Sequence, residues 1–134
     1  MFEFHIDPRF SETDALGHIN NTVLPVWFEA ARADLFRLVH PRLTRDDWPM
    51  ILASIKVDFI DQIHLGGGVT IRTGIQKIGT KSFTVEQQAF QHDKLVARGE
   101  AVLVWFDYRQ QTSQPTPEEV RLLLHPHLLE NSPA

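Results

Sequence analysis

The feature that most constrains the fold is a run of residues, 22–39, that is apolar on almost every side of a predicted helix. One helical face is formed by residues at three- and four-residue spacings, namely Val23, Val26, Trp27, Ala30, Leu35 and Leu38. Further apolar residues fall on the other faces, namely Leu24, Phe28, Ala31 and Phe36. Only a narrow stripe suits water or polar contacts, formed by Glu29, Arg32, Ala33 and Arg37. A helix of this kind is surrounded by protein, so other elements must enclose it.

The two ends of this helix are marked by local signals. Asn21 or Thr22 can serve as the N-cap, and Pro25 falls in the first turn, where a missing N–H has little effect. A His-Pro pair ends the helix after Val39. The loop in front of the helix carries Asp14, so an acidic residue is expected just before the helix amino terminus.

Beyond residue 50 the apolar period changes from 3.6 to 2, which indicates strands. Four strands joined by short turns are expected, at residues 51–63, 69–78, 82–91 and 95–106. Gly99 suggests a bulge in the last of them. A half-buried strand is also expected at residues 2–10, where Pro8 limits it to a sheet edge or a strand end. Short turns imply antiparallel pairing.

A short helix is expected to close the fold, from about Pro117 to Leu124. Thr116 supplies its N-cap and Glu119 completes a capping box. The order of elements is satisfied by one α+β domain, residues 1–134, in which a five-stranded antiparallel sheet wraps around one long central helix. Because such a sheet covers only one side of the helix, the free faces and strand edges predict a two-fold dimer.

Composition excludes several classes of protein. The 134 residues include no cysteine, which excludes disulfides, thiolate metal sites and a cysteine nucleophile. A net charge of -4 argues against a nucleic-acid partner. No apolar run approaches the ~18 residues of a membrane span, and the first residues do not form a secretory signal. We therefore expect a soluble, cytoplasmic protein.

The position of Asp14 suits acyl transfer. A helix amino terminus offers unpaired N–H groups and a partial positive charge, which can hold a developing oxyanion beside the carboxylate. A thioester fits this arrangement because its thiolate leaving group, with a pKa of about 8.5, needs little help from an acid. Asp14 could act as a nucleophile or as a general base on water. The alternative is that Asp14 only bonds nearby N–H groups in a turn.

Other motifs support no further site. Of the seven histidines, only His125 and His127 are close in sequence, without a carboxylate pattern, so no metal site is expected. Residues 74–82 differ from a phosphate loop because Lys does not follow the second Gly and the segment joins two strands. There is no Gly-x-Ser-x-Gly elbow. Glu29 is a weaker catalytic candidate, since pairing along the polar stripe explains it.

Three segments carry a resemblance to a known family. They are TDALGHINN at residues 13–21 followed by WFEAAR at 27–32, KIGTKSFT at 77–84, and the stretch from Phe106-Asp107 to TPEEV at 116–120. Together they resemble the hotdog-fold acyl-CoA thioesterases of the 4-hydroxybenzoyl-CoA thioesterase class. The resemblance implies dimers, often paired into tetramers, with active sites at the subunit interface. This sequence differs from the family pattern at Leu24, where Tyr is frequent, and at Pro25, where a helix-forming residue is usual.

The resemblance also assigns roles to residues of this chain. Asp14 takes the place of the catalytic aspartate, and the backbone N–H of Asn21 takes the place of the oxyanion donor. Contacts near the thioester are implied for Gly17, His18 and Asn20. Contacts with the coenzyme A arm are implied for Lys81 and Ser82. A third group would line the acyl side from a strand facing the partner, namely Val57, Asp58 and Phe59.

The expected function is hydrolysis of an acyl-CoA to a carboxylic acid and free coenzyme A. Coenzyme A enters as part of the substrate, and no metal or organic cofactor is needed. One alternative on the same fold is an enoyl thioester hydratase or dehydratase, for which His18 and Glu29 are the available pair. Another is an acyl-CoA-binding sensor without catalysis. The acyl group and the choice between dimer and tetramer stay open.

Overall fold

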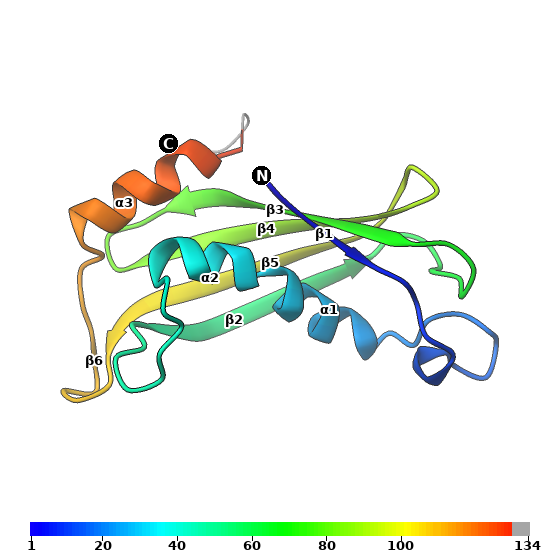
Figure 1. Cartoon of the computed structure of the whole chain (residues 1–134), viewed down its shortest axis with the longest axis horizontal. Coiled ribbons are helices and arrows are strands. Elements are labelled where there is room, and N and C mark those ends of the chain that lie inside the picture. The colour runs from blue at the N-terminus through cyan, green and yellow to red at the C-terminus, as the bar shows by residue number, and fades with distance from the viewer. Residues whose placement is uncertain (130–134) are drawn as a thin grey trace.

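The computed structural model describes residues 1–129, and its fold is one curled antiparallel sheet with helices on its concave face (Figure 1). The strands are β1 (Phe2–Ile6), β2 (Met50–Phe59), β3 (Val69–Ile78), β4 (Ser82–Gln91), β5 (Lys94–Asp107) and β6 (Thr112–Ser113). The helices are α1 (Val23–Ala31), α2 (Ala33–Val39) and α3 (Glu118–Leu124), with 3-10 turns at Phe10–Glu12 and His125–His127. None of the helices within residues 1–129 is long and apolar enough to cross a membrane.

The sheet order is β1-β3-β4-β5-β2, with the two-residue β6 paired to β5. The strands expected at residues 69–78 and 82–91 are confirmed at those bounds. The first strand ends at Ile6 and β2 ends at Phe59, both earlier than expected, and β6 was not expected at all. β2 forms a free edge, and nearly all of its residues are exposed in the protomer.

The central helix is not continuous, contrary to the prediction of a single helix over residues 23–39. It divides into α1 and α2 at Arg32, whose backbone has φ -77° and ψ -9°. Two apolar clusters hold the pieces to the sheet. Around α1 lie Leu24, Trp27, Phe28, Ile71, Ala89 and Ala97. Around α2 and α3 lie Leu35, Val39, Ile75, Val85, Leu103 and Leu124.

One stripe of α1 is left uncovered in the protomer. Val26 is 61% exposed, and Glu29 and Ala30 are exposed beside it. The helix is therefore enclosed by the sheet on one side only, as the size of the sheet implied. Val26 and the exposed β2 edge are the apolar surfaces that a second subunit would have to cover.

Two local predictions are wrong. Gly99 does not form a bulge, because it pairs in register with Val57 and Gln87. A Cβ at Gly99 would lie 2.9 Å from the Phe28 ring, so the glycine makes room for that ring instead. The capping box at α3 is also absent. Pro117 is the N-cap, without a side-chain cap bond, and the buried hydroxyl of Thr116 has no hydrogen-bond partner among the described residues 1–129.

Candidate functional site

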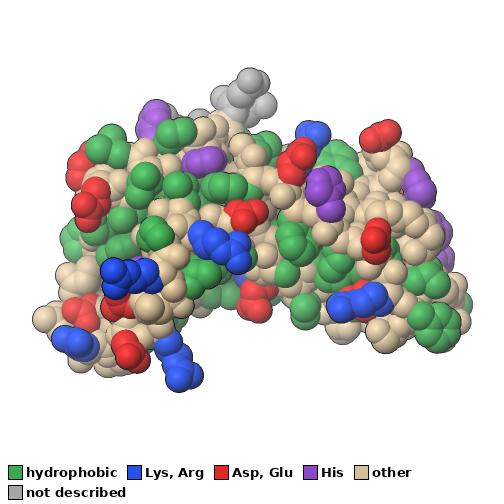
Figure 2. Space-filling model, viewed as in Figure 1, with side chains coloured by type: hydrophobic (Ala, Val, Ile, Leu, Met, Phe, Trp, Pro, Cys, Tyr) green, Lys and Arg blue, Asp and Glu red, His purple; other side chains and the backbone are tan. Residues whose placement is uncertain are grey.

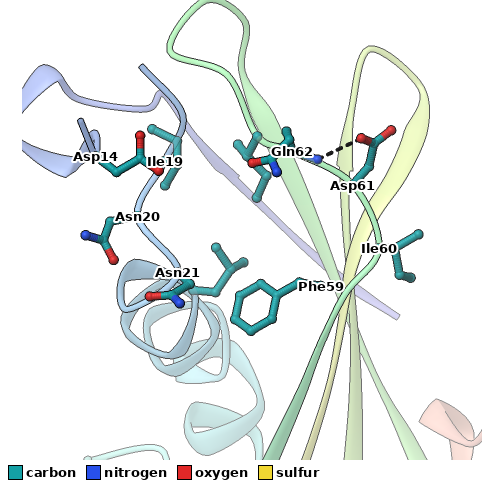
Figure 3. A pocket seen from close by; sticks show the side chains of 10 residues that line it. Asp14, Ile19, Asn20, Asn21, Phe59, Ile60, Asp61 and Gln62 are labelled. Carbon is teal, nitrogen blue, oxygen red and sulfur yellow. Dashed lines mark hydrogen bonds between the residues drawn. The ribbon is translucent and has the colours of Figure 1, made fainter. Parts of the chain in front are cut away.

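A cavity of about 650 Å³ opens between the start of α1 and the end of β2. One wall comes from the loop before α1 and its first turn, and the other from the chain that leaves β2 (Figure 3). The lining residues are Asp14, Ile19, Asn20, Asn21, Leu24, Phe59, Ile60, Asp61, Gln62 and Ile63. Asp14, the first residues of α1 and Phe59 therefore share one cavity.

Asp14 is held in a turn by its own carboxylate. Its Oδ1 accepts the N–H of Leu16 at 2.8 Å and the N–H of His18 at 3.1 Å. Its backbone N–H donates to the His18 carbonyl at 2.7 Å, and Gly17 at φ +81° allows the chain to reverse. The turn interpretation of Asp14 is thus confirmed as far as Oδ1 is concerned. Among residues 1–129, no hydrogen bond uses Oδ2.

The helix amino terminus beside Asp14 keeps a free donor. Asn20 Oδ1 accepts the N–H of Thr22 at 3.0 Å, and the Asn20 carbonyl accepts the N–H of Val23 at 3.0 Å. The N–H of Asn21, between them, bonds to no residue in the described range 1–129. The N-cap position is Thr22, one of the two residues that the sequence predicted, but the side chain that accepts a backbone N–H there belongs to Asn20. The Asn21 N–H stays available at a cavity wall.

The buried carboxylate of Glu12 attaches the loop that carries Asp14 to α1. No motif in the sequence marks Glu12 for this role. Glu12 is 8% exposed, and its Oε2 accepts the indole N–H of Trp27 at 2.8 Å. Arg9 donates to the same carboxylate from its backbone at 2.8 Å and from its guanidinium at 2.9 Å. The hydrogen bond from Arg9 is the main reason that the pKa of Glu12 is lowered to about 2.

The other cavity carboxylate, Asp61, lies on the wall opposite Asp14, and its carboxylate points away from Asp14 (Figure 3). Its side chain accepts the N–H of Gln62 at 2.8 Å and forms an ion pair with Lys94, and the hydrogen bond from Lys94 lowers its pKa. Asp61 is therefore neutralised by a cation on its own side of the cavity. Asp14 is the cavity carboxylate that lies beside the helix terminus.

Several predicted substrate contacts lie outside this cavity in the protomer. The His18 ring packs edge-on against His64, with centroids 5.1 Å apart, and Asp58 pairs with Lys56. Lys81 lies in the turn between β3 and β4, and Ser82 begins β4. Both are beside α3, at the opposite end of the sheet from the loop before α1 (Figure 1). Ser82 pairs with Val104 of β5, while Asp61 at the cavity bonds through its N–H to the Val96 carbonyl of the same strand. The separation of eight residues between these two positions on β5 puts Ser82 roughly 25 Å from the cavity. Their roles stay predictions.

The arrangement gives no support to the hydratase pair. Glu29 is exposed on α1, and neither it nor His18 is among the residues that line the cavity. Within residues 1–129, no three or more His, Asp or Glu side chains are grouped to hold a metal ion. On the face shown in Figure 2, basic, acidic and hydrophobic side chains are interspersed, and no basic patch covers that face.

Comparisons with known proteins identify a family and several relatives of this chain. Residues 8–124 match the sequence profile of the family described as "Thioesterase-like superfamily". An uncharacterized protein of Bacillus subtilis, YsmA, is 28% identical over 80 residues, which cover 60% of this chain and 54% of that protein. The match thus spans about half the length of this relative.

Solved structures give closer agreement. A "predicted thioesterase" from Bacillus stearothermophilus is 39% identical, covers 99% of this chain and 98% of its own, and superposes with a TM-score of 0.92. A thioesterase of Thermus thermophilus, solved with coenzyme A and Zn, is 29% identical over 91% of this chain and 95% of its own, with a TM-score of 0.80. A gentisyl-coenzyme A thioesterase, BH1999, is 25% identical over 91% of this chain and 98% of its own, with a TM-score of 0.76. The expected hotdog fold is confirmed.

Proposed function

The chain belongs to the thioesterase-like superfamily, and from this premise we propose that it is an acyl-CoA thioesterase of the 4-hydroxybenzoyl-CoA class. The observation that carries the proposal is that Asp14 and Asn21 line one cavity and that the Asn21 N–H bonds to no residue within 1–129. The thioester carbonyl oxygen would accept the Asn21 N–H, and the positive end of α1 would stabilise the oxyanion. The thiolate of coenzyme A leaves, and the acyl group departs as a carboxylate.

Asp14 has two ways to bring about this reaction. As a general base, its Oδ2 takes a proton from water while the water oxygen attacks the carbonyl carbon. As a nucleophile, Oδ2 attacks the same carbon to form a mixed anhydride, which water then hydrolyses. In both cases Oδ1 stays bonded to Leu16 and His18, which fixes the direction of Oδ2.

A coenzyme A thioester is favoured by the Thermus thermophilus relative, which was solved with coenzyme A. We further propose that two protomers pair through the free edge of β2. The edge exposes Ile55 and Phe59, at 48% and 55%, and such a long apolar edge is normally covered. Antiparallel pairing of two β2 strands would set the Met50 end of one against the Phe59 end of the other. The partner's sheet would then close the open side of the cavity.

The test is thiol release from a panel of short, long, branched and aromatic acyl-CoAs. Asp14→Asn should lower turnover at least ~100-fold, because Asn keeps the turn but lacks a base or nucleophile. Asp34→Asn, which changes an exposed carboxylate on α2, is the matched control and should keep wild-type turnover. Near wild-type turnover in Asp14→Asn refutes the assignment. Tight binding of acyl-CoAs by the wild type without thiol release would instead identify a sensor.

A further inference from the structure

The guanidinium of Arg32 is buried and forms no ion pair with an anion of the described residues 1–129. Arg32 is 5% exposed, and one of its terminal nitrogens donates to Gln87 Oε1 at 3.2 Å. Its Nε is buried and has no hydrogen-bond partner, and no salt bridge involves Arg32 within residues 1–129. Burial lowers the pKa of Arg32, and the negative charge of Glu29, three residues earlier, offsets this in part. A buried cation with unused donors is unfavourable until an acceptor joins it.

The position of this guanidinium is fixed by Gln87. The amide nitrogen of Gln87 donates to the Phe28 carbonyl at 2.8 Å and to the Thr73 hydroxyl at 3.1 Å. These two bonds hold Gln87 Oε1 toward Arg32. Since a guanidinium has five N–H donors and the contact with Gln87 occupies one nitrogen, donors remain for an incoming oxygen.

Arg32 and Gln87 line a second, narrow cavity between α1 and the β2 edge. The other lining residues are Pro25, Phe28, Ile55, Lys56, Val57, Gly99 and Glu100. Its volume is about 10 Å³, which is room for about one oxygen atom of the size of water.

Both cavities are lined by residues of α1 on one side and of β2 on the other. Leu24, Phe28 and Arg32 are spaced by four residues and so share one helical face. On β2, Phe59 and Val57 share one strand face. Leu24 and Phe59 line the large cavity, while Phe28 and Val57 line the small one. The eight residues from Leu24 to Arg32 span roughly 12 Å at the helical rise.

We propose that Arg32 binds the far end of the acyl group, and that the preferred substrate is an ω-carboxyacyl thioester, the monothioester of a dicarboxylic acid. The inference rests on the proposed thioesterase function. The thioester carbonyl sits between Asp14 and Asn21, and one oxygen of the terminal carboxylate enters the space beside the guanidinium. The methylene chain runs along Leu24 and Phe28, and these side chains must shift to admit it because they are only 1% and 2% exposed in the protomer. An anion is favoured over a hydroxyl because the group it meets is a buried cation.

The test compares acyl-CoAs of matched chain length that end in a methyl group or in a carboxylate. Wild-type protein should show at least a ~10-fold higher kcat/KM for the carboxylate member at the best length. Arg32→Met should abolish or reverse this ratio, and Arg32→Lys should retain part of it. Arg37→Met, which removes an exposed arginine of α2, is the matched control and should leave the ratio unchanged. Equal losses on both substrates in Arg32→Met would show that Arg32 is only structural and overturn the proposal.

A binding measurement separates this inference from the proposed function. Titration calorimetry of wild-type protein with free dicarboxylic acids and with monocarboxylic acids of equal length needs neither turnover nor a foldable variant. Dicarboxylates should bind at least ~10-fold more tightly, and equal affinity overturns the inference. Absence of thiol release from every acyl-CoA, together with selective dicarboxylate binding, would refute the thioesterase proposal while retaining the Arg32 site.

Discussion

Replacing Glu12 by Gln should loosen the attachment of the Asp14 loop to α1. The variant keeps the size of the side chain but removes the negative charge that faces Arg9 and the indole N–H of Trp27. A Gln amide can satisfy one of these donors with its oxygen, while its own N–H group then faces another donor. The backbone of Glu12 also holds the loop, since its carbonyl accepts the Asn20 N–H at 2.8 Å.

The size of the effect follows from the pKa of Glu12, which lies at about 2 against an ordinary value of 4.5. The difference corresponds to roughly 3 kcal/mol of folding free energy at neutral pH. The side chain of Arg9, its main cause, is 66% exposed, so solvent screening reduces the contribution to about 1–2 kcal/mol. For a chain of this length we expect the Tm of Glu12→Gln to fall by about 5 °C at pH 7.

The pH dependence provides the decisive measurement. Because the pKa of Glu12 is lower in the folded state, its stabilisation is complete above pH ~4.5 and is lost as pH falls through about 2. Urea unfolding followed by circular dichroism should show the full difference between wild type and Glu12→Gln at pH 7, and less than half of it at pH 3. Glu119→Gln, at an exposed carboxylate of α3, should match wild type throughout. An undiminished difference at pH 3, or none at pH 7, would refute the reasoning.

Two further substitutions test the packing and the assembly. Gly99→Ala should lower the free energy of unfolding by about 1–3 kcal/mol, because its Cβ would lie 2.9 Å from the Phe28 ring. Adding Phe28→Leu to this variant should recover part of the loss. Thermal unfolding measures both effects, and an unchanged Tm in Gly99→Ala contradicts the prediction. Ile55→Arg puts a charge in the middle of the free β2 edge and should yield monomers with reduced thiol release. Sedimentation velocity checks this, and an intact dimer would remove β2 from the interface.

How far the sequence predicts the fold depends on whether the signal is local. In β4 every second residue is buried, so its alternation gave the strand bounds correctly. β2 lies at an edge and is exposed on both faces, so its alternation does not mark where pairing stops. The interruption between α1 and α2 was missed because it accompanies a contact from Arg32 to Gln87, 55 residues away.

The same division applies to the candidate site. Asp14 and Asn21 are seven residues apart and joined by one loop, so their shared place at the helix amino end could be predicted from sequence. The opposite wall, with Asp61 and Gln62, is set by the path of the chain after β2. The burial of Glu12 depends on Trp27, fifteen residues later, and no sequence pattern marks that pair.

The turn role of Asp14 and its proposed role in hydrolysis are compatible, because they use different oxygens. Oδ1 accepts two backbone N–H groups, and this fixes the plane of the carboxylate. Oδ2 makes no hydrogen bond within residues 1–129 and belongs to a side chain on the cavity wall. An Asn at this position can still accept those N–H groups through Oδ1, whereas Ala cannot. Loss of turnover in Asp14→Asn with an unchanged Tm would therefore measure the chemistry of Oδ2 apart from the turn that positions it.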